Sequence, residues 1–66
     1  MKILIIEDEY RMALDLQATL FELEPEAMFL PVIDTVAAAV RFFQTQPPPD
    51  LAFFDVQLAD GSSFDV

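Results

Sequence analysis

The chain has 66 residues, of which 55% are apolar, 12 are acidic and 3 are basic, and it contains neither cysteine nor histidine. This composition allows one small domain and excludes disulfide bonds, thiolate zinc sites and any chemistry that uses histidine as a base or a metal ligand. The net charge of −9 disfavours binding to nucleic acid or to an anionic membrane surface. The opening apolar run is too short for a signal peptide or a membrane span, so we expect a cytoplasmic protein.

The first part of the chain predicts a strand followed by a helix. Residues 3–6 are an uninterrupted aliphatic run, typical of a strand that is covered on both faces in a parallel sheet. From residue 10 to residue 24 the apolar period becomes helical, and Asp8 or Glu9 is expected to cap this helix or to complement the charge at its N-terminus. Its buried face is predicted to carry Met12, Ala13, Leu16, Leu20 and Leu23.

The rest of the chain predicts a second strand, a second helix and a third strand. Residues 28–33 are apolar, but Pro31 cannot donate to a ladder, which places this strand at a sheet edge. Asp34 and Thr35 are candidate caps for a helix over residues 36–44, whose buried face is predicted to carry Val36, Ala39, Val40 and Phe43. The third apolar run covers residues 51–56, and residues 57–63 have turn composition.

Alternating strands and helices predict an α/β fold with a parallel sheet and the element order β-α-β-α-β. Two strand orders fit, 1-2-3 and 2-1-3, and Pro31 favours 2-1-3 because that order puts the second strand at an edge. The first and third strands are then neighbours. Glu7, Asp8 and Asp55 follow their carboxyl ends, which is where open α/β sheets bind ligands.

Three carboxylates at one edge of a sheet repel one another. Two unit charges ~4 Å apart repel by about 4 kcal/mol at an effective dielectric constant of ~20. Either one carboxyl group is protonated or a cation is bound, and oxygen ligands alone suit Mg²⁺, Mn²⁺ or Ca²⁺. Taken singly, an acidic pair after a strand is more often a helix cap, and a lone aspartate is more often a turn former. The combination favours a site.

Two segments, ILIIEDE at residues 3–9 and FFDVQLADG at residues 53–61, resemble the receiver domain of bacterial two-component response regulators. The forms of these motifs are most similar to those of regulators that carry a LytTR-type DNA-binding domain downstream, and the resemblance extends over all 66 residues. It implies a three-layer, flavodoxin-like and CheY-like parallel sheet. Residues 1–66 would be the N-terminal half of that domain.

The resemblance also implies a role for each acidic residue of the two motifs. Asp55 would be the phosphoacceptor, phosphorylated by a sensor histidine kinase, and the aspartyl phosphate would control transcription through the DNA-binding domain. Mg²⁺ would be bound directly by Asp8 and Asp55, by the backbone carbonyl of Gln57, and by Glu7 through water. Such a chain is a signalling acceptor rather than an enzyme.

The sequence departs from the family pattern in two ways. Ala59 and Ser63 stand where the family usually has proline and glycine. The family's later strands, which supply a hydroxyl residue and a lysine to the phosphoryl group, would follow residue 66. The 66-residue chain by itself is therefore expected to be a truncated domain and a poor phosphoacceptor.

Two other functions remain open at the level of sequence. Phosphatases of the haloacid-dehalogenase type also use an aspartate at a strand end, but they usually need a second aspartate where Gln57 stands. The other is a half-domain that only self-associates and is not phosphorylated. The third strand, apolar on both faces and without proline or lysine, would then be an exposed edge that pairs with another copy in a homodimer or a larger assembly.

Overall fold

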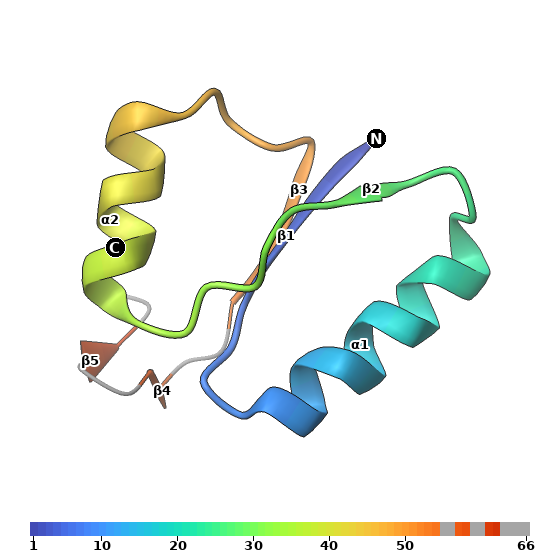
Figure 1. Cartoon of the computed structure of the whole chain (residues 1–66), viewed down its shortest axis with the longest axis horizontal. Helices are drawn as coiled ribbons and strands as arrows, with labels where there is room; N and C mark the ends of the chain where they lie inside the picture. Colours follow the sequence, from blue (N-terminus) through green and yellow to red (C-terminus); the bar gives the residue numbers. More distant parts are fainter. Residues whose placement is uncertain (55–56, 59–60, 63–66) are drawn as a thin grey trace.

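The computed structural model describes residues 1–54, 57–58 and 61–62 (Figure 1). Its elements are β1 (Lys2–Ile6), α1 (Tyr10–Leu23), β2 (Met28–Phe29), α2 (Val36–Thr45), β3 (Leu51–Phe54), β4 (Gln57–Leu58) and β5 (Gly61–Ser62). Strands β1, β2 and β3 form one parallel sheet in the order β2-β1-β3. The structure thus confirms a small α/β fold and the predicted strand order 2-1-3.

The central strand β1 is buried on both faces by the two helices, which lie on opposite sides of the sheet (Figure 1). Leu4 and Ile6 pack with Ala39 of α2. Ile3 and Ile5 point the other way and pack with Ala13 of α1. Because side chains alternate along a strand, an aliphatic run without polar interruption is what a strand covered on both faces requires.

The buried face of α1 is narrower than the sequence predicts. Ala13, Leu16 and Leu20 pack against the sheet as expected. Met12 and Leu23 were expected beside them but are 60% and 71% exposed. In the described part of the chain the sheet has only three strands, so it covers the centre of the helical stripe and leaves the side chains at its margins and at its end in solvent.

The second strand is interrupted where the proline lies. Sequence analysis predicted one strand over residues 28–33, but β2 covers only Met28–Phe29, and pairing resumes at an isolated bridge between Ile33 and Ile6. The backbone N–H of Ile33 donates to the carbonyl of Ile5 at 3.0 Å. Pro31 has no N–H to donate, and its fixed φ angle does not suit a continuous ladder, which explains the gap.

Strands β4 and β5 were not predicted. They form a separate antiparallel pair in which Gln57 is opposite Ser62 and Leu58 is opposite Gly61. The sequence indicated only a turn over residues 57–63, and two-residue strands are too short to produce a readable alternation of polar and apolar residues. The predicted continuation of the third strand through residues 55–56 lies outside the described residues.

Candidate functional site

The candidate site lies at the carboxyl edge of the parallel sheet. Ile6, the last residue of β1, is paired with Phe54 of β3 and bridged to Ile33 on the other side. The chain segments that follow Ile6 and Ile33 therefore leave the sheet at the same edge, which is also the edge at which β3 ends. Glu7 and Asp8 follow Ile6, as sequence analysis predicted.

Backbone and side-chain hydrogen bonds hold Glu7 at this edge. Its N–H donates to the carbonyl of Ile33 at 2.8 Å, which extends the pairing one residue beyond β1. Its carboxylate oxygen Oε1 accepts a hydrogen bond from the N–H of Glu9 at 3.0 Å. Glu7 is half-buried and Asp8 is exposed. One carboxylate is thus tied to the loop before α1, while its neighbour reaches solvent.

The acidic pair borders a cavity of about 430 Å³ between the start of α1 and the segment after β2. The cavity is lined by Glu7, Asp8, Tyr10, Leu14, Val32 and Asp34. Sequence analysis considered Asp34 only as a helix cap and missed its place beside the acidic pair. The parallel bridge between Ile6 and Ile33 explains this position, because the residues that follow two bridged positions emerge side by side.

The expectation that Glu9 caps α1 through its side chain is wrong. Glu9 is the N-cap residue by position, but its side chain makes no capping hydrogen bond. Glutamate is poor at this position because its longer side chain does not fold back onto the first turn as readily as those of serine, threonine, aspartate or asparagine. The acidic segment is therefore not explained by helix capping through Glu9.

The remaining predicted site residues are only partly described. Asp55, the predicted phosphoacceptor, follows Phe54 in the sequence and lies outside the described residues, as do Ala59 and Ser63. Gln57 is the first residue of β4, and its backbone is paired with that of Ser62. The role predicted for its carbonyl oxygen, as a metal ligand, remains a prediction.

The donor set at this edge contains only oxygen, which is the chemistry that Mg²⁺ takes from proteins. Glu7 and Asp8 are the two predicted donors whose side chains the structure describes. Among residues 1–54, 57–58 and 61–62, no three acidic residues come close enough together to hold a metal ion.

Comparisons of this chain with family models, with curated proteins and with solved structures gave no match. Within the described part of the chain, neither helix has the length and the apolar character needed to cross a membrane.

Proposed function

We propose that this chain is the N-terminal half of a response-regulator receiver domain with a flavodoxin-like, CheY-like fold. In this proposal Asp55 accepts a phosphoryl group from a sensor histidine kinase, and the phosphorylated domain controls a LytTR-type DNA-binding domain. The observation that carries the proposal is the parallel pairing of β1 with β3, with Ile6 opposite Phe54. Glu7 and Asp8 follow the first of these residues, and Asp55 follows the second in the sequence.

The proposal assigns a different task to each carboxylate. Asp8, which is exposed, is the direct metal ligand, and Glu7 acts through water because its carboxylate already accepts the Glu9 N–H. Gln57 supplies its backbone carbonyl. When bound, Mg²⁺ offsets the negative charge of the transferred group and of the carboxylates around it.

Asp55 is the proposed nucleophile. Its carboxylate oxygen forms a P–O bond to the phosphorus of phosphohistidine while the P–N bond breaks, and the released imidazole takes a proton from solvent. The product is an aspartyl phosphate on this chain and a free histidine on the kinase. The step needs no oxidant or reductant, since no atom changes its oxidation state.

Magnesium titration of the 66-residue chain tests whether the acidic pair is a site. We expect Mg²⁺ binding in the millimolar range, followed by calorimetry or by chemical-shift changes at Glu7 and Asp8. Asp8→Asn should weaken this binding at least about tenfold, because even residues that only support a metal ligand change affinity about 10- to 100-fold.

Asp15→Asn is the matched control for this titration, since it removes the same charge from an exposed position on α1. It should leave Mg²⁺ affinity within about twofold, because Asp15 does not line the cavity beside the acidic pair and salt screens an exposed charge. If both variants lower affinity equally, binding is diffuse attraction to an acidic chain and the proposed metal role of Asp8 is wrong.

A further inference from the structure

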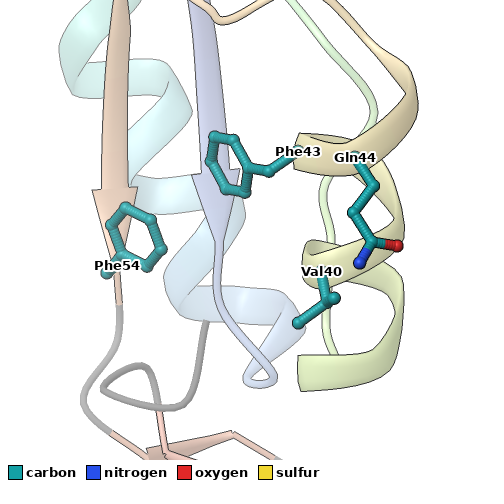
Figure 2. A pocket seen from close by; sticks show the side chains of 4 residues that line it. All are labelled: Val40, Phe43, Gln44 and Phe54. Carbon is teal, nitrogen blue, oxygen red and sulfur yellow. The ribbon is translucent and has the colours of Figure 1, made fainter.

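A stacked pair of phenylalanine rings joins α2 to the last residue of β3. The Phe43 and Phe54 rings have centroids 6.2 Å apart and planes inclined by 13°. Figure 2 shows the Phe43 ring reaching from α2 toward the Phe54 ring, and Val40 and Gln44 complete the lining of this groove of about 400 Å³. Near-parallel rings at this separation attract each other in addition to the apolar area that they bury.

Phe43 is held from the α2 side by contacts that lead into the core. Its ring lies edge to face with the Phe42 ring, with centroids 5.4 Å apart and planes inclined by 88°. Phe42 in turn packs against the buried cluster that contains Ala39 of α2 and Ile6 of β1. The Gln46 N–H donates to the Phe42 carbonyl at 2.8 Å, so the helical hydrogen bonds extend past Phe43. Phe43 therefore offers Phe54 a partner on a fixed element.

Phe54 is the last residue of β3 and the residue before Asp55 in the sequence. Its backbone is paired with Ile6 of β1. Because side chains alternate along a strand, Phe54 lies on the same face as Ala52, which packs against the cluster below α2. Consecutive Cα atoms are ~3.8 Å apart, so the position of Phe54 sets the point from which Asp55 continues the chain.

We propose that Phe43 is a positioning residue for the phosphoacceptor. By stacking on Phe54 it holds the end of β3, and with it Asp55, in the geometry that attack on a phosphoryl donor needs. This inference rests on the proposed function of Asp55. A nucleophile must be held close to the atom that it attacks, and a displacement of ~1 Å caused by a distant change can lower a rate about 100-fold.

The two rings can be changed without changing the core. Among the described residues, neither Phe43 nor Phe54 belongs to either of the two buried clusters that the helices form with β1. A leucine in place of Phe43 keeps an apolar side chain on α2 but removes the ring that stacks on Phe54. The contact that this substitution weakens is therefore the one between α2 and the end of β3.

Phosphorylation kinetics of the protein in its natural full-length form test the proposal. The rate is followed by intact mass with saturating Mg²⁺ and acetyl phosphate. Phe43→Leu should lower the maximal rate about three- to tenfold, because the end of β3 loses its stacking partner. Phe43→Tyr keeps the stacked ring and should retain at least about half of the natural rate.

Phe21→Leu is the matched control, since it makes the same change at an exposed phenylalanine of α1. Its rate should stay within about twofold of the natural rate, because surface substitutions away from special contacts have small effects. The loss in Phe43→Leu should appear in the maximal rate, with the acetyl phosphate concentration at half-maximal rate changed by less than about twofold. Circular dichroism should show that all three variants are folded at the temperature of the assay.

The outcomes separate this inference from the proposed function. If Phe43→Leu reacts as fast as the natural protein, or if Phe43→Tyr is as slow as Phe43→Leu, Phe43 does not position Asp55, although Asp55 remains the phosphoacceptor. An unfolded Phe43→Leu variant would also overturn the inference, because the ring would then hold the fold as a whole. If the natural protein gains no phosphoryl group, the proposed function is wrong and the inference is wrong with it.

Discussion

At the scale of single residues, the two helix starts show how side-chain length decides capping. The Thr35 hydroxyl accepts a hydrogen bond from the N–H of Ala38 at 3.1 Å, as the sequence predicted. At the start of α1, Glu9 makes no such bond, and the Glu7 carboxylate accepts the Glu9 N–H instead. The short Thr35 side chain therefore bonds to the first turn of its own helix, whereas the longer Glu7 side chain bonds to the loop before α1.

The Thr35 cap gives a prediction at this scale. Thr35→Ala removes the acceptor of one N–H in the first turn of α2 and should lower the free energy of unfolding by about 1 kcal/mol. Thr35→Ser keeps the hydroxyl and should lose less than half as much. Urea unfolding followed by circular dichroism measures both values. Equal losses in the two variants would mean that the methyl group of Thr35, rather than its hydroxyl, stabilises the helix start.

At the scale of elements, the existence and order of the helices and main strands were predictable, but the exact buried faces were not. The helical period predicted Phe43 on the buried face of α2, whereas Phe42 packs against the core and Phe43 lines a groove with Val40, Gln44 and Phe54 (Figure 2). The two positions are adjacent on the helix. Which of them faces the sheet depends on how α2 is rotated over Leu4 and Ile6, and this rotation is a tertiary property.

The close approach of α2 to β1 at Ala39 gives a prediction for this element. Ala39 is fully buried against Leu4 and Ile6, so Ala39→Leu should destabilise the fold by about 1–3 kcal/mol through overpacking. Ala38→Leu adds the same atoms at an exposed position of the same helix and should change stability by less than about 0.5 kcal/mol. Thermal unfolding of both variants decides, and a neutral Ala39→Leu would contradict the packing described for α2.

At the scale of the whole molecule, one proline and one aliphatic run were enough to predict the sheet order. Pro31 placed the second strand at the edge, and the run over residues 3–6 matched a strand covered on both faces. The same reasoning predicted that Glu7 and Asp8 end the central strand. It missed Asp34, because only the bridge between Ile6 and Ile33, a contact across 27 positions of the chain, brings Asp34 to the acidic pair.

The central claim is that an aspartate accepts a phosphoryl group at the sheet edge where Glu7 and Asp8 lie. The most direct measurement is the intact mass of the protein, in its natural full-length form, after incubation with Mg²⁺ and a small-molecule phosphodonor. We predict the gain of one phosphoryl group that hydroxylamine removes, as expected for an acyl phosphate. Asp55→Asn should abolish the gain and Asp15→Asn should retain it. Undiminished phosphorylation of Asp55→Asn, or none of the natural protein, would contradict the claim.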